Sequence, residues 1–363
     1  MQSFQVLNID DALKKNIIKM GLSTPTEIQR QCIEPALEGR DVLGVSQTGS
    51  GKTAAFLIPV IARLMKNEQS TALVLAPTRE LASQIKDHAR RLLDNINSVR
   101  IALLIGGEPY HKQIQQLKRF PRLVIGTPGR VNDHLNRNAL KLKFCEHFVL
   151  DEMDRMLETG FEEDVRAISG YFGKAQVQTL LFSATQAPNV TRLMNQLLKD
   201  PIKIDLSGAK AIHSDIDMKH VFVKGGDKFP QLMHELNERD GSVIVFVKTK
   251  KSSEMMAQQL FDKGFEAIAI HGDLPQGKRR RVLGDFRTGK SRILVATDVA
   301  ARGLDIDHVA HVINYDLPYA AADYIHRAGR TGRAGRTGSA LCLMTKKDKK
   351  HWQMIQRVIG QPM

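Results

Sequence analysis

The segment VLGVSQTGSGKTAAFLIPVIARLMK (42–66) decides the fold of the first half of the chain. It starts as an apolar strand, continues as the glycine-rich loop SQTGSGKT (46–53) and ends as an apolar helix. A strand, such a loop and a helix in this order form a P-loop, in which backbone N–H groups and the helix N-terminus bind phosphate. Lys52 is predicted to reach the β and γ phosphates of a nucleotide, and the Thr53 hydroxyl to bind Mg²⁺. Ser46 stands at the first position of the pattern, which is generally glycine.

The apolar run FVLDE (148–152) ends in two acids. Two acids after a strand are most often part of a solvated turn, but in a chain with a P-loop they indicate nucleotide hydrolysis. Asp151 is then the predicted Mg²⁺ ligand. Glu152 is predicted to orient or polarise the water that attacks the γ-phosphate.

Short apolar, β-branched runs alternate with longer amphipathic stretches, which predicts an α/β fold with mostly parallel sheets flanked by helices. In the first half the runs are residues 42–45, 72–77, 122–128, 148–152 and 179–185. In the second half they are residues 243–249, 266–272, 291–298, 311–316 and 338–344. The segment 206–214 is small and polar without a clear period. We therefore predict a first domain over 1–205, a short linker over 206–214 and a second domain over 215–363, with a cleft between the domains.

The chain has 363 residues, 42% of them hydrophobic, and its 53 Lys and Arg against 39 Asp and Glu give a net charge of +14. This composition excludes a disordered or fibrous protein, and the basic balance suits a polyanionic partner. The longest apolar stretch, 54–62, is about half of the roughly 20 residues that cross a bilayer, so no membrane segment is expected.

Cys32, Cys145 and Cys342 lack the spacing of a metal-binding motif, and the N-terminus lacks the features of a secretory signal. We expect reduced thiols in a cytoplasmic protein.

The second half carries the basic run HRAGRTGRAGR (326–336). Taken alone, arginines among glycines are most simply a solvated loop. In a two-domain NTPase the same arginines can act as fingers that neutralise charge on the transferring phosphoryl group, which is worth roughly 10³- to 10⁵-fold in rate. Hydrolysis would then depend on domain closure.

The chain resembles the DEAD-box RNA helicases over nearly its whole length. The resemblance rests on motifs in the family's order: Phe4 with TPTEIQ (24–29), SQTGSGKT (46–53), PTRELA (77–82), GG (106–107), TPGR (127–130), DEMD (151–154), SAT (183–185), HGDLPQ (271–276), ATDVAARGLDI (296–306) and HRAGRTGR (326–333). It implies two tandem RecA-like domains, the first of which binds ATP. It also implies ATP and Mg²⁺ as cofactors and RNA-stimulated ATP hydrolysis, coupled to local unwinding of RNA duplexes or remodelling of RNA–protein complexes.

By the same resemblance, Gln29 reads the edge of adenine, Phe4 packs on the base and Asp305 approaches the ribose. The implied nucleotide-binding residues are Phe4, Thr24, Gln29, Ser46, Gln47, Thr48, Gly49, Ser50, Gly51, Lys52, Thr53, Gly303 and Asp305. The implied catalytic residues are Lys52, Asp151, Glu152, Ser183, Thr185, His326, Arg327, Arg330 and Arg333. Within this set Ser183 and Thr185 link the ATP site to the RNA site, while Arg330 and Arg333 are the fingers.

The resemblance places RNA, as a single strand or short duplex, across both domains. The implied RNA-binding residues are Pro77, Thr78, Arg79, Gly106, Gly107, Thr127, Pro128, Gly129, Arg130, Thr249, Gln276, Arg279 and Thr297. Such contacts read phosphate, 2′-OH and strand shape, so little sequence specificity is expected. We expect a monomer with ribonucleoprotein partners.

Three residues depart from the family pattern, and two other hypotheses stay open. Met153 stands where the family has Ala, Leu22 where many members have an aromatic residue, and Met218 where the family often has Gln. The first alternative is an ATP-gated RNA clamp or scaffold with very slow hydrolysis, which Met153 favours. The second is a DNA helicase of the same superfamily. Of the twelve histidines only His326 is assigned a role, because the others show no ligand spacing.

Overall fold

The structure is a computed structural model that describes residues 3–47, 49–173, 177–185, 188–206, 216–301, 309–332 and 337–359. The chain divides into two compact units, Met1–Ala209 (unit 1) and Lys210–Met363 (unit 2). Apart from Leu206, the predicted linker lies outside the described residues. Each unit is built on one parallel sheet, which confirms the predicted fold class.

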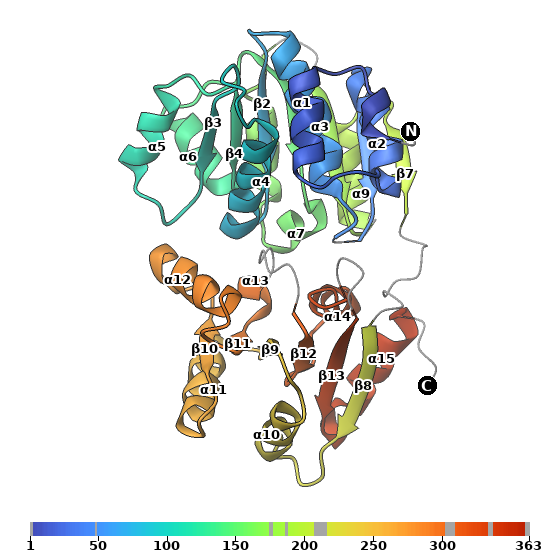
Figure 1. Cartoon of the computed structure of the whole chain (residues 1–363), viewed down its shortest axis with the longest axis vertical. Helices are drawn as coiled ribbons and strands as arrows, with labels where there is room; N and C mark the ends of the chain where they lie inside the picture. The colour runs from blue at the N-terminus through green and yellow to red at the C-terminus, as the bar shows by residue number, and fades with distance from the viewer. Residues whose placement is uncertain are drawn as a thin grey trace. The chain divides into compact units, whose positions relative to one another are not determined.

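The sheet of unit 1 has seven parallel strands in the order β3-β4-β2-β5-β6-β1-β7 (Figure 1). Its strands are β1 (Val42–Val45), β2 (Thr71–Leu75), β3 (Ile101–Leu104), β4 (Leu123–Gly126), β5 (Cys145–Leu150), β6 (Gln178–Ser183) and β7 (Ile202–Asp205). The flanking helices are η1 (Phe4–Val6), α1 (Asp11–Lys19), α2 (Glu27–Leu37), α3 (Lys52–Lys66), α4 (Arg79–Leu92), α5 (Tyr110–Leu117), α6 (Pro128–Asn136), α7 (Met153–Glu158), α8 (Glu162–Ser169) and α9 (Pro188–Leu197).

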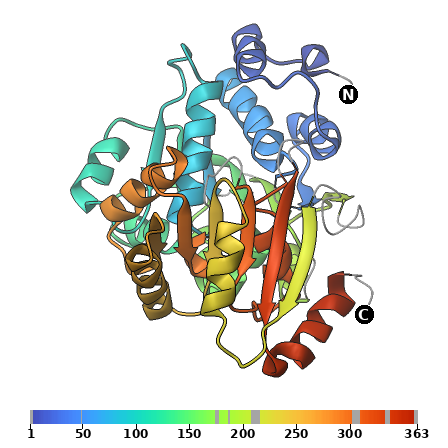
Figure 2. The same ribbon diagram turned by 60° about the horizontal axis from the view of Figure 1, so that its bottom comes forward.

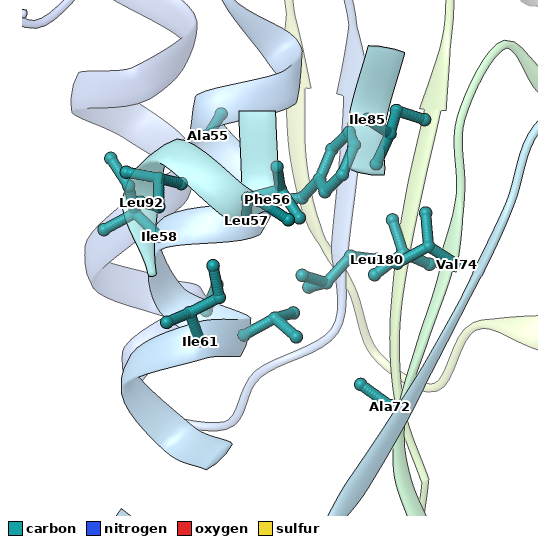
Figure 3. Packing of buried hydrophobic residues seen from close by; sticks show 14 of the residues in the cluster. Ala55, Phe56, Leu57, Ile58, Ile61, Ala72, Val74, Ile85, Leu92 and Leu180 are labelled. Atoms are coloured by element: carbon teal, nitrogen blue, oxygen red, sulfur yellow. The ribbon is translucent and has the colours of Figure 1, made fainter. Parts of the chain in front are cut away.

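Successive residues of these strands enter two different hydrophobic cores. Leu73 and Leu75 of β2 pack in the core that holds α6 to α9, whereas Ala72 and Val74 pack in the core that holds α1 to α4. Figure 3 shows the second of these cores, with Phe56 of α3 close to the strands. Alternate side chains of a strand point to opposite faces, so a sheet covered on both faces needs continuous apolar strands. This is why the strand segments read as unbroken apolar runs.

The sheet of unit 2 has six parallel strands in the order β10-β11-β9-β12-β13-β8. Its strands are β8 (Ile216–Phe222), β9 (Val243–Phe246), β10 (Ala267–Ile270), β11 (Ile293–Ala296), β12 (His311–Asn314) and β13 (Gly338–Met344). Its helices are α10 (Phe229–Asn237), α11 (Lys250–Asp262), α12 (Gln276–Arg287), α13 (Asp298–Ala301), α14 (Ala321–Ala328), η2 (Lys346–Asp348) and α15 (Lys349–Ile359). One core holds α10 and α11 and another holds α12 to α14. Figure 2 shows α10, in yellow, lying across the strands.

All ten predicted apolar runs overlap a strand, but three strands were not predicted. They are β3, β7 and β8, and each carries more polar or half-exposed residues than the central strands. All three form an outer edge of their sheet. In the described part of the chain no helix is both long and apolar enough to cross a membrane.

Candidate active site and nucleic-acid interface

The P-loop connects the end of β1 to the first turn of α3. Gly49 and Gly51 have φ values of 85° and 97°, a backbone conformation that side chains with a Cβ rarely adopt. The Lys52 ammonium is buried and donates to the carbonyl oxygen of Ser46 at 2.6 Å, so it closes the loop on itself. Ser46 and Ser50 are joined through their hydroxyls at 2.8 Å. Thr48 lies outside the described residues. The result is a cradle of backbone groups at a helix N-terminus, which fits bound phosphate.

The N-terminus of α2 is tied to this loop by two side chains. Thr26 Oγ1 donates to the carbonyl oxygen of Ser50 at 2.7 Å, and Gln29 Nε2 donates to that of Gly51 at 3.0 Å. Gln29 Oε1 also accepts from the Thr26 backbone N–H at 2.9 Å, which completes a capping box. A Cβ on Gly51 would lie 2.4 Å from Gln29 Nε2, so only glycine fits here. The residue implied to read adenine therefore also holds the P-loop.

Two other residues with implied nucleotide contacts have different surroundings. Phe4 is buried in the core that holds α1 to α4, where its ring contributes to packing within unit 1. Thr24 is exposed just before α2. Phe4 as seen here is a packing residue, so contact with a base would require its ring to leave this core.

Asp151 follows the last residue of β5 and is almost fully buried. Burial raises the pKa of this carboxyl to about 7, although the nearby Lys52 ammonium acts in the opposite direction. Asp151 Oδ1 accepts from the backbone N–H of Glu152 at 3.0 Å. Glu152 has φ 52° and ψ 53°, a left-handed conformation that costs a non-glycine residue free energy and that is often found at functional sites. Asp151 is buried and Glu152 is half-exposed, so the two adjacent carboxylates have different surroundings.

The residues that follow this acid pair connect β5 to the neighbouring strand β6. Thr185 Oγ1 donates to Asp154 Oδ2 at 3.3 Å, and Ser183 Oγ donates to the carbonyl oxygen of Thr185 at 2.7 Å. The DEMD and SAT motifs thus form one hydrogen-bonded group within unit 1. Met153 is fully buried among apolar residues of the core that holds α6 to α9. Its long side chain fills core volume.

These residues fit ATP and a magnesium ion. The loop supplies phosphate-binding backbone groups, and Asp151 and Thr53 supply the oxygen donors that Mg²⁺ prefers. Among the described residues no group of three or more His, Cys, Asp or Glu is placed to hold a metal ion. Such a site would therefore rely on few protein ligands, as nucleotide-bound Mg²⁺ sites generally do.

In unit 1 the motifs implied to bind RNA follow the carboxyl ends of three adjacent strands. Thr78 caps α4 after β2 by accepting from the Leu81 N–H at 3.2 Å, and Thr127 precedes α6 after β4. Gly106 follows β3, and a Cβ there would lie 3.0 Å from Nη2 of Arg79. The Arg79 guanidinium therefore rests on the glycine pair, of which Gly107 takes a φ of 75°. Pro77 and Pro128 are buried, while Gly129 and Arg130 are half-exposed.

The implied RNA-binding residues of unit 2 differ in exposure. Thr249 is exposed and caps α11 by accepting from the Ser252 N–H at 3.0 Å. Gln276, Arg279 and Thr297 are buried. Arg279 donates to the carbonyl oxygen of His271 at 2.8 Å, so its guanidinium holds the backbone of unit 2 together. A direct phosphate contact by Arg279 would have to replace this internal one.

The arginines of unit 2 are also held inside the unit. Arg327 forms a bidentate pair with the Asp298 carboxylate at 2.5 and 2.7 Å and donates to Asn314 Oδ1 at 2.8 Å. All three nitrogens of its guanidinium donate within unit 2, so Arg327 as seen here positions α13 against α14. Arg330 and His326 are buried, and Arg330 Nε donates to the His326 carbonyl at 3.3 Å. Gly303, Asp305 and Arg333 lie outside the described residues.

Comparison with known proteins agrees with this arrangement. Residues 26–193 match the DEAD/DEAH box helicase family model, and residues 227–335 match the helicase conserved C-terminal domain. The chain is 40% identical over 365 residues to the DEAD-box ATP-dependent RNA helicase CshA of Geobacillus kaustophilus, covering all of this chain and 78% of that protein. The chain belongs to the DEAD-box family of ATP-dependent RNA helicases. The resemblance found in the sequence is thereby confirmed.

Solved structures of DEAD-box proteins share the fold. Dbp5 of S. cerevisiae, solved with RNA and ADP BeF3, is 32% identical with a TM-score of 0.89, over 100% of this chain and 95% of that one. Mss116p, solved with ssRNA and AMP-PNP, is 32% identical with a TM-score of 0.88, over 97% and 76%. A DEAD box protein of Methanococcus jannaschii is 39% identical with a TM-score of 0.58, over 100% and 98%.

The structure also identifies two residues near the motifs to which the sequence analysis assigned no function. Gln113 of α5 and His134 of α6 are both buried, and each lies next to motif residues. His134 is among the histidines to which the sequence assigned no role. Each of the two is a polar residue on the buried face of a short helix, and this pattern could have been noticed in the sequence. The pattern does not show, however, which residue each side chain contacts.

Proposed function

We propose that this chain is an RNA-stimulated ATPase that couples ATP hydrolysis to local unwinding of RNA duplexes or to remodelling of RNA–protein complexes. The order of strands in unit 1 carries the proposal. The motifs implied to bind RNA follow β3, β4 and β2, which are adjacent, and the nucleotide motifs follow β5, β6 and β1, which are also adjacent. Because the carboxyl ends of parallel strands lie at one edge of the sheet, the two ligands would share that edge.

The residues of unit 1 support hydrolysis by water. Lys52 and the P-loop N–H groups would bind the β and γ phosphates, and Thr53 and Asp151 would hold Mg²⁺, which neutralises phosphate charge. Glu152, fixed in its left-handed turn, would orient the attacking water. Arg330 of unit 2, and Arg333, would supply positive charge to the transferring phosphoryl group.

Substitution of Glu152 tests the assignment. Glu152→Gln keeps the size of the side chain and should lower the RNA-stimulated ATPase rate about 10²-fold or more, with ATP and RNA affinity retained. Glu146→Gln is a matched control, because Glu146 lies near the start of β5, whereas Glu152 follows the end of that strand. Wild-type turnover by Glu152→Gln would exclude this role for Glu152.

The nature of the nucleic acid is tested by comparing RNA and DNA of equal length. We expect RNA to stimulate ATP hydrolysis with little dependence on sequence, because the implied contacts are to phosphate and 2′-OH. Equal stimulation by DNA would instead favour a DNA helicase. Duplex separation should accompany turnover. Tight ATP-dependent retention of RNA with negligible turnover would favour the clamp.

The burial of Met153 favours a changed rate of ATP hydrolysis over a loss of activity, since its side chain packs in the core.

We further propose Mg²⁺ as the metal, a monomeric state with ribonucleoprotein partners, and a cytoplasmic location. Cys32, Cys145 and Cys342 are buried as free thiols, as suits a reducing compartment.

A further inference from the structure

A single side chain closes the loop that contains Gly106 and Gly107. Gln113 Nε2 donates to the carbonyl oxygen of Ile105 at 2.9 Å and to that of Glu108 at 3.2 Å. These two carbonyls flank the glycine pair on either side. Gln113 is 1% exposed, and its bond to Ile105 is buried while its bond to Glu108 is partly buried. The shape of the glycine loop is therefore set by α5 and not by the loop alone.

His134 fixes the orientation of Gln113. His134 Nε2 lies 3.1 Å from Gln113 Oε1. Because both amide hydrogens of Gln113 face carbonyl oxygens, its Oε1 must accept, and the Nε2 of His134 must carry the proton. Among the described residues, His134 Nδ1 is buried without a hydrogen-bond partner, as an unprotonated ring nitrogen here would be. His134 belongs to α6, which begins with Pro128 of the TPGR motif.

The same face of α6 also carries Arg130. The rings of Tyr110 and His134 stack at 4.4 Å with an interplanar angle of 11°, and the Arg130 guanidinium lies 5.9 Å from the centre of the Tyr110 ring. Residues 130, 134 and 137 recur at helical spacing on this face, and the Arg137 guanidinium lies 4.9 Å from the same ring. Nη1 of Arg130 is buried without a hydrogen-bond partner among the described residues. Figure 1 shows α5 and α6 beside β3 and β4.

We propose that Gln113 and His134 are positioning residues for RNA binding, which lock the Gly106-Gly107 loop to the helix that carries Arg130. The inference rests on the proposed function, because it needs this face of unit 1 to bind RNA. The lock lets two motifs on adjacent strand ends keep a fixed separation. A ligand that spans both motifs then binds without first ordering the loop, which lowers the entropic cost of binding.

Unit 1 contains a second pair with the same chemistry, which serves as a matched control. Gln178 Nε2 donates to the carbonyl oxygens of Ala36 and Arg40, both at 2.8 Å, and Gln178 Oε1 lies 3.0 Å from Nδ1 of His147. Both residues are buried. Gln178 is the first residue of β6, so this pair lies near the amino ends of the strands, away from the motif loops.

The test compares Gln113→Ala, His134→Phe and the double variant with Gln178→Ala, His147→Phe and their double. For each full-length protein the ATPase rate is measured against RNA concentration, with ATP affinity and thermal unfolding. Disrupting the Gln113 pair should raise the half-saturating RNA concentration about tenfold, with kcat at saturating RNA and ATP affinity unchanged. The Gln113 and His134 effects should be non-additive, since the two residues act as one unit. The control pair should lower thermal stability similarly and leave the half-saturating RNA concentration within about twofold.

The outcomes separate this inference from the proposed function. If the wild-type protein shows no RNA stimulation, the proposed function is wrong. If the wild type is stimulated but the Gln113 variants lose only stability, as the Gln178 variants do, then Gln113 and His134 are structural residues and the inference is overturned.

Discussion

Gln29 Nε2 donates a hydrogen bond to the carbonyl oxygen of Gly51 at 3.0 Å, which ties the start of α2 to the phosphate-binding loop. Gln29→Ala removes this bond and the capping box, so of its two ties to α2 the loop keeps only the bond from Thr26 to Ser50. We expect the half-saturating ATP concentration to rise about tenfold, the equivalent of roughly 1.4 kcal/mol. The ATPase rate, measured against ATP concentration at saturating RNA, gives this half-saturating value.

Gln31→Ala is the matched control for Gln29. Gln31 lies two residues further along α2 and is exposed, with its amide bonded to Glu27. The Gln31→Ala variant should therefore keep the ATP affinity of the wild type. An unaltered ATP requirement in Gln29→Ala would show that the loop does not need the Gln29 bond.

Arg79 and Arg130 are expected to meet RNA phosphates. Each of Arg79→Gln and Arg130→Gln should weaken RNA binding and reduce the slope of log affinity against log salt by about 0.7, the value for one phosphate contact on a single strand. Fluorescence anisotropy over a salt series measures the slope. Arg40→Gln removes a cation paired with Asp200 next to β7, and its salt slope should match that of the wild type. Unchanged slopes in both test variants would place the RNA elsewhere.

Arg122 and Arg292 perform the same structural task in the two units. Each residue directly precedes the second strand of its sheet. Arg122 donates to the carbonyls of Leu64 and Asn67 at the end of α3, and Arg292 donates to those of Leu236 and Arg239 at the end of α10. Such side chains satisfy the last carbonyls of a helix.

We expect Arg122→Ala and Arg292→Ala each to lower the free energy of unfolding of their own unit by about 2–4 kcal/mol. Urea denaturation measures the change. Arg100→Ala is the control, because Arg100 makes an exposed bond to the Arg119 carbonyl and should cost under about 1 kcal/mol. Equal, small losses in all three variants would show that the helix ends are satisfied without these arginines.

The stability of unit 1 should fall in mild acid because His134 is buried in its neutral form. Burial, followed by the nearby Arg130 charge, lowers the pKa of His134 from 6.5 to about 4. Between these values the unfolded chain binds a proton that the folded protein excludes, so stability is lost as the pH falls from 6.5 towards 4. By pH 5 this loss amounts to roughly 2 kcal/mol.

His134→Phe cannot be protonated and should lack this part of the pH dependence. The stability advantage of the wild type over the variant should therefore shrink between pH 7 and pH 5, as measured by urea denaturation. The pKa of His147 is also lowered by burial, and its contribution remains in both proteins. Parallel stability curves would mean that His134 accepts a proton as readily when folded as when unfolded.

Much of the fold could be predicted because the central strands are covered on both faces. Residues such as Leu73 and Val74 enter different cores, so neither position tolerates a polar residue and the run is unbroken. The edge strands β3, β7 and β8 are covered less completely. The sequences of β7 and β8 mix apolar and polar residues, and β3, although apolar, alternates half-exposed and buried residues. The local sequence pattern therefore misses these three strands, where burial is partial.

The sequence by itself determined the P-loop, the acid pair and the family, because glycines, Lys52 and adjacent acids must stand at fixed spacings along one chain to bind phosphate. Only the tertiary structure decided which of the arginines predicted to bind RNA or ATP are already hydrogen-bonded inside the protein. Arg279 and Arg327 are buried on internal acceptors, whereas the partners of Gln113 come from α6 and from the glycine loop. Hydrogen bonds between distant segments depend on strand order and side-chain burial, and neither leaves a periodic signal in the sequence.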